Sequence, residues 1–290
     1  MDTTRRTFAA LPLAIGGLLA ARPAAAAPDN SAIGRPEFRE HKATYGLVYR
    51  LPRDVNEVLD ARLYPVLHER LLKLGLADEV RTFNLPHVTV VHIHNADPMT
   101  PRRMLAALGK VPPVLSLTLK DFYNTEAAKD AGAPWWFDLG VVKSGPGYTA
   151  MMAYNTVATA ALTPLRDGPL PRCTGPVYAK MGDAAKELVA TVGVSGVNVV
   201  KDGKETASHN PHNTLMYSMA RYDARLQAAM KEVADEANKI LPGGIVTQFK
   251  DVSIVEIGFM GNVLREFYRI SLADGSAWDT TSGQAARLGA

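Results

Sequence analysis

Hydrophobic and polar positions along the chain follow two periods, about 3.6 residues in some segments and two in others. The first period is typical of helices that bury one face, and the second of half-buried strands. Proline and glycine separate these segments. The pattern predicts a first unit of strand, helix, strand, helix and strand at residues 45–51, 55–74, 86–94, 102–108 and 114–120, with Asp54 as N-cap of the first helix.

The same order then repeats in a second unit. Two related units favour a bilobal α/β or α+β domain with a cleft between lobes, at about 45–125 and 135–272. An insertion at 166–208 has no counterpart in the first unit and ends in a possible strand and turn. The Gly- and Ser-rich residues 273–290 are expected to form a flexible tail. The second unit has predicted strands at 135–142, 211–219, 246–257 and 264–272, and helices at 148–165 and from Asp223 to about 240.

The N-terminal residues have the features of an export signal. The segment Thr4-Arg5-Arg6-Thr7-Phe8 is a twin-arginine signature, and an apolar run and an alanine-rich cleavage site follow it. The run is too short for a confident membrane-spanning helix. We therefore interpret 1–27 as a cleaved twin-arginine signal peptide and 28–44 as a linker. The protein is then expected in the periplasm, with the twin-arginine export machinery as a partner during secretion and no stable membrane association after cleavage.

Composition and charge limit the function further. The 290 residues are 47% hydrophobic and 21% charged, which is ordinary for a globular protein. The formal net charge is +3, and three arginines and one aspartate in the signal segment account for +2 of it, which leaves +1 for the mature chain. This charge gives little hold on long nucleic acid. Cys173 is the single cysteine, so an internal disulfide is excluded.

Two segments of the chain share one short pattern. Pro86-His87-Val88-Thr89-Val90 and Pro211-His212-Asn213-Thr214-Leu215 each have a proline, a histidine, and a threonine two places after the histidine. Side chains two residues apart in a strand point to the same face. The pattern therefore predicts that His87 shares a face with Thr89, and that His212 shares one with Thr214.

The paired segments resemble the His-x-Thr/Ser-x motifs of the two-histidine (2H) phosphoesterase superfamily, which includes cyclic phosphodiesterases and bacterial 2′-5′ RNA ligase-like proteins. The resemblance covers residues 45–272 and implies an α+β, bilobal fold with two pseudo-symmetric β/α lobes and a central cleft. It also implies that His87 and His212 are the catalytic pair and that Thr89 and Thr214 bind phosphate oxygens, with no metal and no cofactor. Histidine suits this role because its ordinary pKa lies near neutrality. Which histidine is the acid and which the base stays open.

The sequence thus favours an exported, metal-independent phosphodiesterase that acts on a 2′,3′-cyclic phosphate, a similar small phosphodiester or a short oligonucleotide. One alternative is a periplasmic protein of the same fold that binds a nucleotide or phosphorylated ligand without turnover. Another is an unrelated fold in which the motifs are accidental, because a single His-x-Thr segment arises easily by chance.

Other residues offer weaker candidates. Alternation places His92 and His94 on the face opposite His87, and together with His209 they suggest a metal site, but no carboxylate or cysteine is spaced to complete it. Aromatic residues near a nucleotide can stack on a base, and basic residues can contact its phosphates. The aromatic candidates, all more typical of core or rim, are Tyr45, Tyr49, Trp135, Trp136 and Tyr217, and the basic ones, more typical of the surface, are Arg50, Lys143 and Arg265.

Overall fold

The structure is a computed structural model of the chain. It describes residues 44–76, 85–126, 135–166, 199–201, 204–206, 209–218, 220–257 and 263–289. The expected signal peptide, nearly all of the expected linker and most of the insertion lie outside these residues. Within the described part, no helix has both the length and the apolar character that crossing a membrane requires.

The described residues form an α+β fold around one large antiparallel sheet. Ten strands pair in the order β12-β11-β10-β9-β1-β2-β7-β4-β3-β8. A separate antiparallel hairpin within the insertion joins β5 (Val199–Lys201) and β6 (Lys204–Thr206). The strands of the large sheet are β1 (Thr44–Arg50), β2 (His87–His94), β3 (Leu115–Glu126), β4 (Trp135–Val141), β7 (His212–Ser218), β8 (Ile245–Phe249), β9 (Asp251–Ile257), β10 (Val263–Ser271), β11 (Ala277–Asp279) and β12 (Ala285–Ala286).

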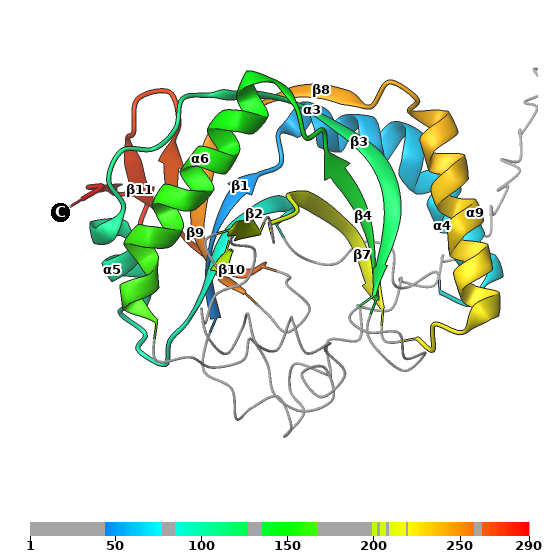
Figure 1. Cartoon of the computed structure of the whole chain (residues 1–290), viewed down its shortest axis with the longest axis horizontal. Helices are drawn as coiled ribbons and strands as arrows, with labels where there is room; N and C mark the ends of the chain where they lie inside the picture. The colour runs from blue at the N-terminus through cyan, green and yellow to red at the C-terminus, as the bar shows by residue number, and fades with distance from the viewer. Residues whose placement is uncertain are drawn as a thin grey trace, which may run out of the picture.

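The helices lie over one face of this sheet. Figure 1 shows a curved sheet with α5 and α6 near its β9–β10 end and α4 and α9 near its β3 end. In place of one continuous first helix, a π-helical stretch interrupts the segment between α3 and α4. The helices are α3 (Arg53–Val58), the π-helical Leu59–Leu63, α4 (Tyr64–Lys73), α5 (Thr100–Ala107), α6 (Gly145–Leu162) with a 3₁₀ turn at Thr163–Leu165, and α9 (Ala224–Ile240).

The two predicted helix caps have different outcomes. The Asp223 carboxylate accepts hydrogen bonds from the backbone N–H groups of Arg225 and Leu226, so this N-cap is confirmed. The prediction for Asp54 is wrong, because α3 already begins at Arg53. The Asp54 carboxylate instead accepts the hydroxyl of Thr247 at 2.9 and 3.1 Å. It therefore ties the start of α3 to β8.

Two strand segments have pairing partners that the order of the chain does not predict. The predicted strand 246–257 bends at Lys250, so that β8 pairs with β3 and β9 pairs with β1. The strand β3 is longer than predicted and pairs with β8 at its start and with β4 along the rest. Thus β3, which follows β2 in sequence, joins β4, whereas β9, which follows β7, joins β1.

The residues from 273 onward, expected to form a flexible tail, instead extend the sheet. The strand β11 pairs with β10, and β12 pairs with β11. Gly275 and Gly283 adopt φ values of 73° and 70°, in the left-handed region that turns between strands require. The glycine and serine content of this segment therefore reflects tight turns.

The core lies between the sheet and the helices. The ring of Tyr49 on β1 packs against Tyr154 of α6 and Phe249 of β8, with centroids 6.3 and 6.0 Å away. Trp135 is fully buried, stacks on Tyr222 and donates its indole N–H to a backbone carbonyl. Tyr49 and Trp135 thus belong to the core and cannot stack on a bound base.

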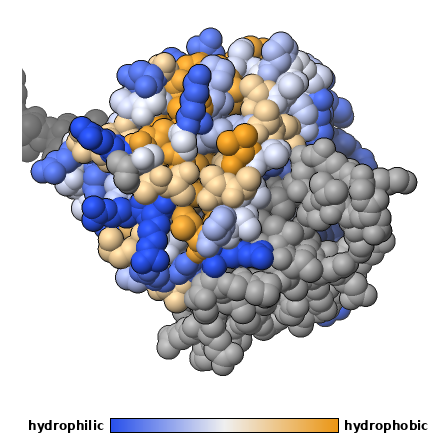
Figure 2. Space-filling model, turned by 60° about the vertical axis from the view of Figure 1, so that its left-hand side comes forward, coloured by the Kyte–Doolittle hydropathy of each residue, from blue (hydrophilic) through white to orange (hydrophobic). Residues whose placement is uncertain are grey.

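On the outer surface that carries α5 and α6, hydrophobic residues gather with hydrophilic ones around them (Figure 2).

A substitution tests the close packing of α6 on β3. A Cβ atom at Gly147 would overlap the backbone carbonyl of Ser116, so Gly147→Ala must displace α6 from the sheet. We expect a loss of about 1–3 kcal/mol in the free energy of unfolding, measured by denaturant titration. The matched control is Gly109→Ala, where a Cβ atom has no neighbour within 4 Å. Equal stability of the two variants would contradict the packing.

Candidate active site

The two motif strands lie side by side in the middle of the sheet. The strand β2 pairs antiparallel with β7 through Val88 and Asn213, the middle residues of the two motifs. Val88 is fully buried in the core on the helix-covered face. Alternation therefore directs the flanking motif side chains to the opposite face, which we call the site face. These flanking residues are His87, Thr89, His212 and Thr214.

The antiparallel register sets the relative positions of these four side chains. Continued from Val88 and Asn213, it aligns His87 with Thr214 and aligns Thr89 with His212. The two histidines are then diagonal neighbours, for which a Cβ separation of about 7–8 Å is typical. The structure thus brings all four predicted site residues together on one face, although they are 125 positions apart along the chain.

A β-bulge directly follows the first motif. In the pairing of β1 with β2 the register skips Val90, the residue after Thr89. An extra residue reverses the alternation of faces. The prediction that His92 points away from the motif side chains is therefore wrong, because Thr89 Oγ1 lies 3.5 Å from His92 Nε2. His92 is buried beside its cross-strand partner Gly46, and the side chain of His94 lies outside the described residues.

The second motif has the same irregularity at the same place. In the pairing of β4 with β7, Asp138 aligns with Thr214 and Phe137 aligns with Met216, so that Leu215 has no partner. Both bulges thus come immediately after the motif threonine. Bulges increase the local twist of a strand and redirect its side chains. The two motifs therefore share a backbone irregularity as well as a sequence pattern.

The motif histidines are held by matching hydrogen bonds. His87 Nδ1 lies 2.7 Å from the carbonyl oxygen of Leu85, and His212 Nδ1 lies 2.6 Å from that of Asn210. A carbonyl oxygen only accepts hydrogen bonds, so each Nδ1 carries the proton. In the neutral ring, Nε2 is then the unprotonated nitrogen. A proton that either neutral ring takes up therefore goes to Nε2.

A buried carboxylate lies next to the second motif. Asp138 on β4 is fully buried, and its Oδ1 accepts the Thr214 hydroxyl at 2.8 Å and lies 3.8 Å from His212 Nε2. Burial raises the pKa of Asp138, while the His212 charge and the hydroxyls of Thr125 and Thr214 act in the opposite direction. Sequence reasoning missed this residue. Its one signal was that Asp138 is the only ionisable residue in the apolar segment 135–142.

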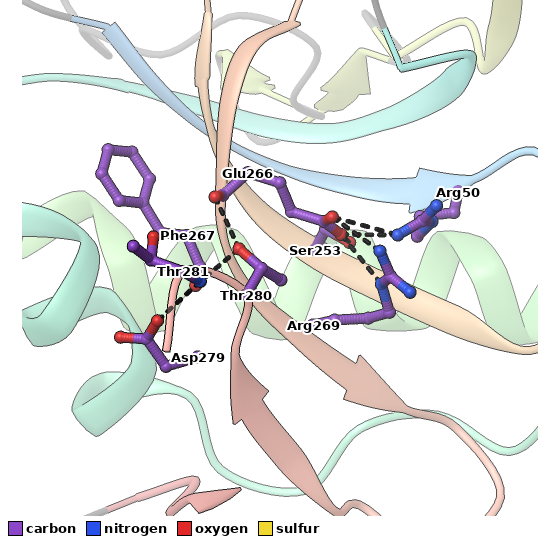
Figure 3. Close-up of polar contacts among 8 residues, drawn as sticks. All are labelled: Arg50, Ser253, Glu266, Phe267, Arg269, Asp279, Thr280 and Thr281. Carbon is purple, nitrogen blue, oxygen red and sulfur yellow. Dashed lines mark hydrogen bonds and ion pairs between the residues drawn. The ribbon is translucent and has the colours of Figure 1, made fainter. Parts of the chain in front are cut away.

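A cluster of charged side chains lies next to the first motif (Figure 3). Arg50 is the cross-strand partner of His87 and donates to both carboxylate oxygens of Glu266, at 2.8 and 3.0 Å. Arg269 also donates to both oxygens, and the Ser253 hydroxyl donates to one of them. One carboxylate thus lies between two guanidinium groups, on the side of β1 that is away from β2. Of these residues, the sequence pointed only to Arg50.

A pocket of about 850 Å³ opens at the end of β1, where β8 bends into β9. None of the four motif residues lines it, but Arg50 belongs both to its wall and to the charged cluster. The pocket therefore adjoins the charged cluster and does not include the motif side chains. Its charged lining residues are Arg50, Arg53, Asp54, Lys250, Asp251 and Arg269.

The described residues contain no group of three or more His, Cys, Asp or Glu side chains arranged to hold a metal ion. His209, one of the candidates for such a site, is buried. Burial, with a smaller contribution from the charge of His212, lowers the pKa of His209 to about 4. His209 is therefore neutral in the folded protein near pH 7.

This buried histidine predicts a pH dependence of stability. Below pH 6.5 the unfolded chain binds a proton at His209, whereas the folded protein resists it until about pH 4. The free energy of unfolding therefore falls as the pH drops through this window, by roughly 3 kcal/mol from this residue. We expect a shallower fall in His209→Gln, measured by denaturant titration from pH 7 to 4. His68→Gln, on the exposed surface of α4, is the control and should follow the wild type.

The chain is similar to the solved structure of Usb1 from Kluyveromyces marxianus, with a TM-score of 0.42 and 13% sequence identity, over 80% of this chain and 98% of that one. No protein-family model and no curated protein sequence matches the chain.

Proposed function

We propose that this protein is an exported, metal-independent phosphodiesterase that opens a 2′,3′-cyclic phosphate or a similar small phosphodiester. The observation that carries the proposal is the pairing of Val88 with Asn213, which makes His87 and His212 diagonal neighbours on the site face. The equivalent hydrogen bonds at their Nδ1 atoms add to it, because they make Nε2 the unprotonated nitrogen of each neutral ring. The resemblance of the paired motifs to the 2H phosphoesterases, with their bilobal fold and central cleft, agrees with this function.

The reaction needs two proton transfers at one phosphorus atom. One imidazole removes a proton from water as the water oxygen bonds to phosphorus. The other gives a proton to the ester oxygen whose bond to phosphorus breaks. The products are a phosphomonoester and a free hydroxyl. The hydroxyl of Thr89 donates to a non-bridging oxygen, and the hydroxyl of Thr214 turns from Asp138 to donate to the other when substrate binds. The positive charge of Arg50 favours the anionic substrate.

The export part of the proposal rests on the N-terminal sequence. If residues 1–27 are a twin-arginine signal, replacing Arg5 and Arg6 together with lysine leaves the precursor in the cytoplasm. Cell fractionation and immunoblotting measure this outcome. Arg22→Lys, near the end of the same segment, keeps the charge and the twin pair and should leave export unchanged. Normal export of the double variant would refute the assignment.

The catalytic part is tested on purified protein with 2′,3′-cyclic nucleotides in the presence of a chelator. His87→Ala and His212→Ala should each lower kcat/KM by about 10²- to 10⁴-fold, the usual contribution of one proton transfer, measured by chromatography of the product. His68→Ala on the exposed surface of α4 is the control. Unchanged turnover in either motif variant would disprove the mechanism. Calorimetric binding without product would favour the alternative of a binding protein.

A further inference from the structure

The two motif histidines face different residues on the strands next to them. In β1 the cross-strand partner of His87 is Arg50, and in β4 the cross-strand partner of His212 is Gly140. A Cβ atom at Gly140 would lie 2.9 Å from the Lys120 carbonyl oxygen. The backbone of β3 therefore excludes any side chain at that position. A cationic side chain therefore occupies the cross-strand position opposite the first histidine, and no side chain fits the corresponding position opposite the second.

The cross-strand partners of the two motif threonines also differ, and here the charged partner belongs to the second motif. The cross-strand partner of Thr89 is the apolar Val48, whereas that of Thr214 is Asp138. Asp138 Oδ1 accepts the Thr214 hydroxyl and lies 3.8 Å from Nε2 of His212. The second motif thus has a buried carboxylate where the first has a hydrocarbon side chain.

We propose that Asp138 is a positioning residue that keeps a proton on the Asp138–His212 pair, so that His212 is the general acid and His87, beside Arg50, is the general base. This inference rests on the proposed function and deepens it. It assigns two roles that the duplicated motif leaves equivalent.

Electrostatics gives the reason for this assignment. A carboxylate near an imidazole favours the protonated ring, and a guanidinium near one disfavours it. Arg50 is the cross-strand partner of His87, but its guanidinium is bound to Glu266 on β10, on the side of β1 away from β2, and Asp251 also offsets its charge. The charge that distinguishes the two histidines is therefore that of Asp138. The Asp138 carboxylate is fully buried, so its interaction with His212 is screened less than it would be in water.

Two other titratable groups of the described residues lie near the pair, and both stay neutral across the working range. Tyr123, the neighbour of Asp138 on β3, has its pKa raised to about 12 by burial and by the Asp138 charge, with an opposing contribution from its hydrogen bond to Asn210. His209 has its pKa lowered to about 4. Both groups are therefore neutral between roughly pH 5 and 9, and neither accounts for a pH dependence in that window.

The step then has a defined direction. The attacking water gives its proton to Nε2 of His87 as its oxygen bonds to phosphorus. The ring oxygen that leaves phosphorus takes a proton from Nε2 of His212. His87 ends the step with one proton more and the pair with one proton fewer. The His212 side chain is 36% exposed, so solvent can return the proton to it.

A change of leaving group separates the two roles. Bis(4-nitrophenyl) phosphate releases nitrophenolate, which leaves at neutral pH without a proton, so this substrate needs no general acid. His212→Ala should lose about 10²- to 10⁴-fold on a 2′,3′-cyclic nucleotide but less than roughly 10-fold on the nitrophenyl diester. His87→Ala should lose activity on both. The assignment would be overturned if the nitrophenyl diester restored the activity of His87→Ala and not that of His212→Ala. It would also be overturned if His212→Ala lost the same activity on both substrates.

The role of Asp138 is tested by the pH profile of Asp138→Asn, which keeps the shape of the side chain. We expect the alkaline limb of kcat/KM to move to lower pH by about 1 unit or more, with the acidic limb unchanged. Asp235→Asn removes the same charge from the exposed surface of α9 and should leave the profile unchanged. A profile of Asp138→Asn that coincides with the wild type overturns this inference alone. A wild-type protein that turns over neither substrate overturns the proposed function as well.

Discussion

The antiparallel pairing of β2 with β7 is the contact on which the candidate site depends. It joins the two motifs through Val88 and Asn213, and the backbone N–H of His87 reinforces it with a hydrogen bond to Asn213 Oδ1. A shift of this register by one residue would turn every motif side chain to the other face. That face is filled by the helices and the core, so a shifted pairing would bury His212 without partners. The packing of the core thus fixes the chemistry on the other side.

Local periodicity was sufficient to predict most strands and helices, because each of them buries one face. It was also sufficient to place each motif histidine with its threonine. It failed at His92, because the bulge at Val90 reverses the faces, and a two-residue period carries no sign of an inserted residue. The bend at Lys250, which divides one predicted strand between two partners, was missed because pairing is not a local property. These features depend on which strands meet.

The charged neighbours of the site were largely missed for the same reason. Arg50 and Glu266 are 216 positions apart, and Asp138 and Thr214 are 76 apart, so no spacing in the sequence links them. A lone charge in an apolar strand was the available sign at Asp138, since a buried carboxylate needs partners to offset the loss of water. Residue types therefore indicated the kind of reaction, but the electrostatic environment of each histidine came only from the fold.

A motif that occurs twice raises a difficulty for the proposed reaction, and the differences between the neighbours of the two motifs resolve it. Two identical motifs in identical surroundings would hold their protons equally, yet opening a phosphodiester needs one protonated group and one unprotonated group at the same moment. In the proposed mechanism Asp138 breaks this equivalence at the second motif, and the backbone around Gly140 leaves no room there for a counterpart of Arg50. In the proposed mechanism, the positions that differ around the two motifs decide the direction of proton transfer, and the shared histidines and threonines decide where the phosphate binds.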